Sequence, residues 1–124
     1  MKTLIVIPAR YASTRLPGKP LLRIAGVPLV VRVLRQAMRC TSVTDVLVAA
    51  DDERIADVVR AEGGQVMLTP PDLPSGGDRV AFAAREYGPA DIIFNIQVDD
   101  PLVGPDIVDP LTELLAPAEC SLIP

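Results

Sequence analysis

The 124-residue sequence predicts an α/β fold in which a mostly parallel sheet lies between two layers of helices. Short, nearly unbroken apolar runs rich in valine and isoleucine recur along the chain, as expected for strands buried on both faces. Between these runs the apolar residues take helical spacing, and strands that alternate with helices form parallel sheets through right-handed crossovers. Ligands bind such sheets beyond the carboxyl ends of the strands, which here means just after residues 8, 50, 68 and 97.

The strands are predicted from uninterrupted apolar segments. The first run is ended by Pro8, the run at the end of the sequence resembles the start of a further strand, and the run before the proline-rich loop is weaker than the others. The segments are residues 4–7, 46–50, 65–68, 91–96 and 119–123.

The first two helices are predicted from apolar faces of period 3.6. Residues 28–38 begin with Pro28, which suits a first turn because its missing N–H needs no partner there. The second helix runs from about residue 52 to residue 62, with Asp51 and Asp52 as N-cap and first-turn acid. The inward residues are expected to be Val30, Val33, Leu34 and Ala37 in the first helix and Ile55, Val58 and Val59 in the second.

The remaining two helices are predicted from capping signals. Ser75 can cap the third helix, with Asp78 at the reciprocal position of a capping box. Asp109 followed by Pro110 predicts the start of the last helix, as an N-cap and a first-position proline. The inward residues of the third helix are expected to be Val80, Ala83, Ala84 and Tyr87.

Composition and charge exclude several classes of protein. Hydrophobic residues at 49% and charged residues at 23% predict one folded domain over residues 1–124. A net charge of −4 argues against binding to nucleic acid or to a membrane surface. The absence of histidine removes histidine catalysis. No signal peptide or membrane-spanning run is present, and Cys40 and Cys120 are expected to be reduced thiols, so a cytoplasmic location is predicted.

A cationic loop follows the first predicted strand. Arg10, Arg15 and Lys19 lie within ten residues of one another, with two hydroxyls and Gly18 between them. Several fixed cations at the ligand-binding end of a sheet can bind the oxygens of a polyphosphate. The alternative, a solvated basic turn, is disfavoured because the loop is basic inside an acidic protein. A P-loop is excluded, because Pro20 stands where that motif needs serine or threonine.

Residues 7–21 resemble the signature of the CMP-Kdo synthetases, the 3-deoxy-manno-octulosonate cytidylyltransferases. Three further segments support the resemblance: residues 49–53, 75–76 and 95–101. It extends along the whole chain, although members of that family are longer, so the chain resembles their N-terminal half. The resemblance implies transfer of CMP from CTP to the sugar acid Kdo with release of pyrophosphate, for lipopolysaccharide biosynthesis.

The resemblance also implies roles for particular residues. Lys19 and Arg15 would act in catalysis, and Gln97 would contact the sugar acid. Asp99 would bind Mg²⁺, although a cap of the turn before Pro101 is an alternative for this carboxylate. The residues implied to bind the nucleotide are Pro8, Ala9, Arg10, Ser13, Arg15, Lys19, Asp72, Ser75 and Gly76.

The sequence departs from the family pattern at several positions. Val98 stands where the family has glycine beside the metal aspartate, and a β-branched residue there disfavours close backbone approach. The half expected to carry a second metal carboxylate and a homodimer interface is missing. Two alternatives to the active enzyme therefore remain: a non-catalytic or decayed CTP-binding fragment, and a related sugar-acid cytidylyltransferase. The other departures are Pro70, Leu73 and Pro74 in the loop before the third predicted helix, Gly77 and Asp78 in that helix, and Asp100.

Overall fold

Four parallel strands form the central sheet of the structure, a computed structural model that describes residues 2–12 and 16–115. Their order across the sheet is β5-β4-β1-β6. The strands are β1 (Thr3–Ala9), β4 (Asp45–Ala50), β5 (Gln65–Leu68) and β6 (Ile92–Asn95). The other elements are η1 (Lys19–Leu21), β2 (Arg23–Ile24), β3 (Val27–Pro28), α1 (Leu29–Met38), α2 (Glu53–Ala61), α3 (Gly76–Tyr87) and α4 (Pro105–Leu115).

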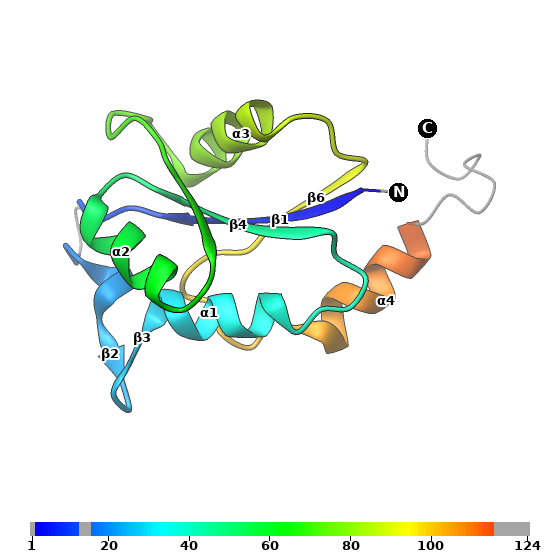
Figure 1. The fold of residues 1–124 in the computed structure, drawn as a ribbon, viewed down its shortest axis with the longest axis horizontal. Coiled ribbons are helices and arrows are strands. Elements are labelled where there is room, and N and C mark those ends of the chain that lie inside the picture. The colour runs from blue at the N-terminus through cyan, green and yellow to red at the C-terminus, as the bar shows by residue number, and fades with distance from the viewer. Residues whose placement is uncertain (1, 13–15, 116–124) are drawn as a thin grey trace.

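Helices cover both faces of the sheet. Figure 1 shows α1 and α2 on one side of the strands and α3 on the other. Alternate residues of β1 divide between the two faces: Ile5 and Ile7 belong to the core under α1 and α2, whereas Leu4 and Val6 belong to the core under α3. This period-2 alternation of apolar residues on both faces is the pattern of a strand buried between two helical layers. The predicted three-layer α/β class is confirmed.

The order of the strands reverses direction at β1. The chain moves from β1 to β4 to β5 on one side, and then crosses over through α3 to place β6 against the opposite edge of β1. In parallel α/β sheets such a switch point opens a crevice beyond the carboxyl ends of the two diverging strands. The fold therefore places its crevice after β1 and β6.

The first strand does not end at Pro8, contrary to the prediction, but continues to Ala9. The Val6 carbonyl accepts a hydrogen bond from the Ile96 N–H at 3.1 Å, so residues 6 and 8 direct their polar backbone groups toward β6. The ladder with β6 has its last pair at Val6 and Asn95. The N–H that Pro8 lacks would lie beyond that last pair, so the proline costs the sheet no hydrogen bond.

The last helix begins at Pro105, so the predicted start at Asp109 was wrong. The Gly104 carbonyl accepts from the N–H groups of Ile107 and Val108, and Pro105 takes the favourable first position that Pro110 was expected to fill. Asp109 instead accepts hydrogen bonds from the backbone N–H and the hydroxyl of both Thr41 and Ser42, at 2.5 to 3.1 Å. Its carboxylate thus joins α4 to the loop that follows α1.

The Asp109 contacts predict a pH-dependent stability. The hydroxyl of Ser42, then the backbone N–H groups, lower the pKa of Asp109 to about 2. A depressed pKa stabilises the fold above the unfolded value of about 3.9, and this stabilisation is lost as the pH falls through about 2. Asp109→Asn should therefore unfold at a lower temperature than the unmodified chain at pH 6, with the difference shrinking between about pH 4 and pH 2. Melting curves would test this, with Glu113→Gln on the exposed face of α4 as control; a difference independent of pH would contradict it.

The inward faces and the N-termini of the helices follow the predicted pattern except at a few positions. Val58, Ala84 and Tyr87 are only half-buried, while Arg79, which was not expected inside, is completely buried. Asp52 is the N-cap of α2 and accepts from the Arg54 N–H at 2.8 Å, but the first-turn acid is Glu53. Pro28 precedes α1 as its N-cap residue rather than lying in its first turn.

Candidate functional site

An open pocket of about 160 Å³ lies beyond the carboxyl ends of β1 and β6, at the switch point of the sheet. The pairing of Val6 with Asn95 brings Pro8 and Gln97, two residues further along each chain segment, to the same level. The pocket is lined by Pro8, Arg10, Lys19, Pro20, Gly76, Gln97, Val98 and Asp99. Segments widely separated in the sequence therefore meet where the fold class predicts a ligand.

Lys19 and Asp99 form an ion pair on this pocket. The Lys19 Nζ lies 3.1 Å from Oδ2 of Asp99, and the two side chains are 38% and 60% exposed. An exposed pair of this kind contributes little to stability, about 0–1 kcal/mol. Both charges are consequently available to a ligand that offers a better partner to each.

Gly18 fixes the position of Lys19. Its φ of 74° lies in the left-handed region, and its N–H donates to the Tyr11 carbonyl at 2.7 Å. A Cβ on Gly18 would also lie only 3.2 Å from the Tyr11 ring. Only glycine meets both conditions cheaply, so this residue closes the loop and begins the short helix that presents Lys19.

Asp51 anchors the other end of the loop. Its carboxylate accepts a hydrogen bond from the Tyr11 N–H at 2.8 Å, and the Arg54 guanidinium lies 3.6 Å from the centre of the Tyr11 ring. Cation–π stacking of this geometry adds to the hydrogen bond. Asp51 was expected to cap α2; the structure instead uses it to tie the cationic loop to the end of β4.

The start of α3 borders the pocket at Gly76. The Ser75 hydroxyl accepts from the Asp78 N–H at 3.1 Å, as predicted for the N-cap. The Asp78 carboxylate accepts from the Ser75 hydroxyl at 2.7 Å, rather than from the Ser75 N–H as in the predicted capping box. The first-turn N–H groups of Gly76 and Gly77 have no acceptor within the helix and remain free for other partners. A Cβ on Gly76 would come within 3.5 Å of Oε1 of Gln97, so the glycine keeps this side of the pocket open.

The pocket brings together six of the residues singled out from the sequence. These are Pro8, Arg10, Lys19, Gly76, Gln97 and Asp99. Ala9 is buried in the core, Asp72 is exposed in the loop after β5, and Ser75 is engaged in its cap; none of the three lines the pocket. Ser13 and Arg15 lie outside the described residues, as does the predicted strand at 119–123.

The donor set suits a magnesium ion shared with phosphate. Among residues 2–12 and 16–115, no group of three or more His, Cys, Asp or Glu side chains could hold a metal by itself. Asp99 is an exposed carboxylate on the same pocket as two cations. Magnesium typically takes one or two carboxylates and completes its shell with waters and substrate phosphates, so one carboxylate here fits.

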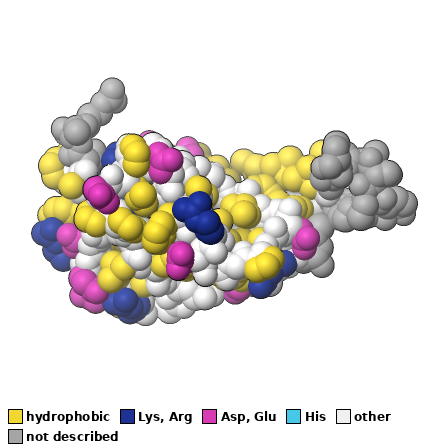
Figure 2. All heavy atoms as spheres, turned by 90° about the horizontal axis from the view of Figure 1, so that it is seen from above, with side chains coloured by type: hydrophobic (Ala, Val, Ile, Leu, Met, Phe, Trp, Pro, Cys, Tyr) yellow, Lys and Arg dark blue, Asp and Glu magenta, His cyan; other side chains and the backbone are white. Residues whose placement is uncertain are grey.

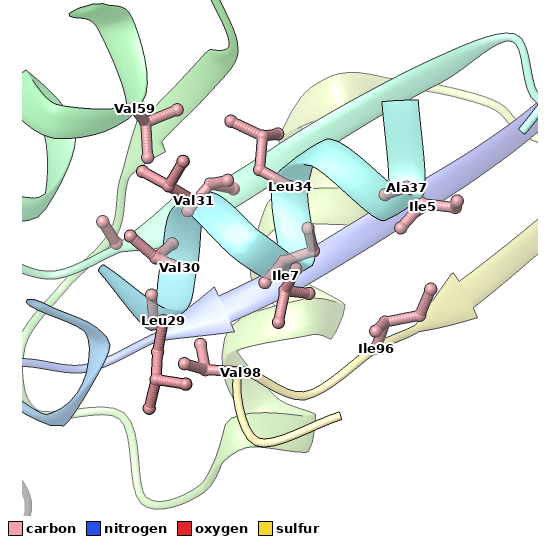
Figure 3. Close-up of a cluster of buried hydrophobic side chains, with 14 of the residues drawn as sticks. Ile5, Ile7, Leu29, Val30, Val31, Leu34, Ala37, Val59, Ile96 and Val98 are labelled. Carbon is pink, nitrogen blue, oxygen red and sulfur yellow. The ribbon is translucent and has the colours of Figure 1, made fainter. Parts of the chain in front are cut away.

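Val98 directs its side chain into the core. It is 7% exposed and belongs to the cluster under α1, where Figure 3 draws it at the same end as Leu29. The φ of Val98 is not positive, because Ala25 is the one non-glycine residue with positive φ in the described part of the chain. The backbone at position 98 therefore needs no glycine, and its valine contributes to packing rather than filling the pocket.

The sequence reasoning missed a buried polar network beside the pocket. Arg79 is fully buried and donates through Nη1 to the Thr69 hydroxyl and, at 2.9 Å, to the Pro70 carbonyl. The Thr69 hydroxyl and N–H both donate to the Ala50 carbonyl, at 3.0 and 2.7 Å. Arginine four residues past a helix cap normally predicts an exposed side chain, so no sequence signal distinguished this one.

The parallel sheet and the cation-lined pocket at its switch point define an α/β protein with a site suited to an anionic ligand. Comparisons with known proteins agree, because residues 4–119 match the family model described as "Cytidylyltransferase". The chain belongs to the cytidylyltransferase family.

Two curated relatives carry the same name. The chain is 50% identical over 113 residues to the 3-deoxy-manno-octulosonate cytidylyltransferase of Acinetobacter baumannii, covering 90% of this chain and 45% of the relative. It is 48% identical over 109 residues to that of Chloroherpeton thalassium, covering 88% and 44%. A solved CMP:2-keto-3-deoxy-manno-octonic acid synthetase complexed with CTP superposes with a TM-score of 0.86 at 43% identity, over 93% of this chain and 47% of that one. The resemblance seen in the sequence is confirmed.

The chain spans about half the length of the curated relatives it matches.

No helix in the described part of the chain is long and apolar enough to cross a membrane. Figure 2, which views the molecule from the side of α3, shows basic and acidic side chains interspersed among hydrophobic ones on that face.

Proposed function

We propose that this chain is the nucleotide-binding half of a CMP-Kdo synthetase, which binds CTP with Mg²⁺ and activates Kdo in the cytoplasm. The observation that supports it best is the convergence of Arg10, Lys19, Gln97 and Asp99 on one pocket at the switch point of the sheet. The similarity of the whole chain to relatives of that name supports the choice of base and of sugar acid.

In the proposed reaction the anomeric hydroxyl oxygen of Kdo attacks the α-phosphorus of CTP. A new P–O bond forms, the bond between the α-phosphorus and the bridging oxygen breaks, pyrophosphate leaves, and the hydroxyl proton passes to solvent. Negative charge moves toward the leaving pyrophosphate, and Arg10 and Lys19 would stabilise it because both already line the pocket. By the resemblance, Ser13 and Arg15 complete the phosphate contacts.

Asp99 would hold Mg²⁺ together with phosphate oxygens of the nucleotide, and the ion would supply neutralisation of the phosphate charge. If Asp99 held the ion, Lys19 would lose its ion-pair partner and could bind phosphate. Gln97 would orient the sugar acid: its amide nitrogen already donates to the side-chain oxygen of Asn95 at 2.7 Å, which fixes the plane of the amide. The cytosine would lie toward Gly76 and the loop after β5.

Pyrophosphate release and calorimetry test the proposal on the same 124-residue chain. We expect Mg·CTP to bind, and to bind more tightly than Mg·ATP, because the pocket at Gly76 is proposed to receive the smaller pyrimidine. Release of pyrophosphate on addition of Kdo would support catalysis by this chain, whereas binding without turnover would leave a CTP-binding module. Failure to bind Mg·CTP would contradict the proposed function.

A further inference from the structure

Arg79 is the one arginine in the described part of the chain that is completely buried. Its Nη1 atom donates to the loop after β5, at Thr69 and Pro70. Its Nε and Nη2 atoms are buried and have no hydrogen-bond partner. Guanidinium groups stay protonated in proteins, so a positive charge with spare donors lies under this loop.

A buried charge with unpaired donors lowers the stability of the fold, which is not expected of a residue that serves only to pack the core. Burial lowers the pKa of Arg79, and the charge of Arg10 acts in the same direction. The charges of Asp51 and Asp72 act in the opposite direction without a hydrogen bond to it. An unsatisfied buried donor costs free energy, and an unbranched apolar side chain such as methionine could occupy the same volume without that cost. Packing alone therefore does not explain an arginine at this position.

The contacts of Arg79 connect the segments around the proposed nucleotide site. Through Thr69 it reaches the Ala50 carbonyl at the end of β4. The next residue, Asp51, holds the backbone of Tyr11 in the cationic loop. Through Pro70 it holds the first part of the base loop, residues 69–75, which ends at the cap of α3.

We propose that Arg79 is a positioning residue that sets the shape of the base loop and thereby the recognition of the nucleoside part of the substrate. This inference rests on the proposed function and deepens it. The Pro70 carbonyl is drawn toward the interior by Nη1, which fixes the direction of the backbone of the following residues. The phosphate contacts are proposed to come from Arg10 and Lys19, and the hydrogen bonds of Arg79 go to Thr69 and Pro70 rather than to either of them.

Calorimetry with two ligands separates positioning of the base loop from a general effect. Mg·CTP carries a base and Mg·tripolyphosphate does not. We expect Arg79→Met to weaken binding of Mg·CTP by about tenfold, the effect of losing one charge-assisted hydrogen bond, and to change binding of Mg·tripolyphosphate by less than about threefold. Arg79→Lys, which keeps the charge but loses the planar fork, should fall between. Arg85→Met, at an exposed position of the same helix, is the matched control and should change neither affinity.

Each other outcome overturns the inference. Equal losses for both ligands would mean that Arg79 acts through charge or overall folding, and unchanged Mg·CTP affinity would mean that the loop does not need it. If the methionine variant does not fold, as judged by circular dichroism, the lysine variant carries the same comparison; if neither folds, the role is structural and the inference fails. If the unmodified chain binds neither ligand, the proposed function itself fails, which distinguishes that failure from a failure of Arg79 alone.

Discussion

Lys19→Ala is expected to weaken binding of Mg·CTP by about ten- to a hundredfold. The side chain lies on the pocket and is 38% exposed, so its ammonium group can reach a ligand without rearrangement of the fold. A hydrogen bond to a charged partner contributes about 1.5–3 kcal/mol, which corresponds to this loss of affinity. Isothermal titration calorimetry in the presence of Mg²⁺ measures it directly.

Asp99→Asn tests the same site, because its effect on CTP affinity should have opposite directions without and with Mg²⁺. Without Mg²⁺, removal of the carboxylate frees Lys19 and removes a negative charge beside the phosphates, so CTP should bind about two- to fivefold more tightly. With Mg²⁺, the variant lacks the proposed metal ligand and should bind CTP more weakly than the unmodified chain. An ion pair that serves only to hold two loops together would give no such reversal.

The control for both substitutions is Lys2→Ala. Lys2 is the only other lysine of the chain, and it precedes β1, at the opposite end of that strand from the pocket. Its ammonium group lies 4.9 Å from the centre of the Tyr87 ring. The loss of one positive charge there should leave CTP affinity unchanged within about twofold. Equal effects at positions 2 and 19 would mean that net charge, rather than a phosphate site, governs binding.

The strands and helices were predictable because their signals are local and repeated. Each strand of the central sheet consists mostly of apolar residues, and α1 buries Val30, Val33, Leu34 and Ala37 as its period of 3.6 requires. The strands β2 and β3 were not predicted, because two residues each are too few to give such a run. The errors arose where one local signal suits two structures. Asp109 before Pro110 matches the start of a helix, yet Pro105 matches it as well, and the contacts of Asp109 with the loop after α1 come from residues far away in the sequence.

The site was predictable to the extent that it depends on strand ends. Arg10, Gln97 and Asp99 follow β1 and β6, and the sheet order alone brings these segments together. The role of Asp51 depends on one hydrogen bond to Tyr11, and that of Arg79 on hydrogen bonds from α3 to Thr69 and Pro70; no spacing in the sequence records either. The direction of Val98 was equally hidden, because it lies in a turn, where neither the period of a strand nor that of a helix applies.

Val98→Gly tests whether the family's glycine would suit this chain. We expect the substitution to lower the free energy of unfolding by about 3 kcal/mol: about 2 kcal/mol from the buried methyl groups and the cavity they leave, and the remainder from the greater freedom of glycine in the unfolded chain. Val98→Ala should cost about 2 kcal/mol for the first of these reasons alone. Urea denaturation measures both values, and Leu102→Ala, at a side chain that is 86% exposed, should stay within about 0.5 kcal/mol of the unmodified chain.

Val98→Gly should not bind Mg·CTP more tightly than the unmodified chain does. Val98 fills the core beneath the pocket and its backbone has no positive φ, so glycine would remove packing without opening a position that the ligand needs. A gain in Mg·CTP affinity together with unchanged stability would contradict this account. It would mean that the valine side chain obstructs the approach of the backbone to the metal or the phosphates, and that its burial in the free chain must be reversed when the nucleotide binds.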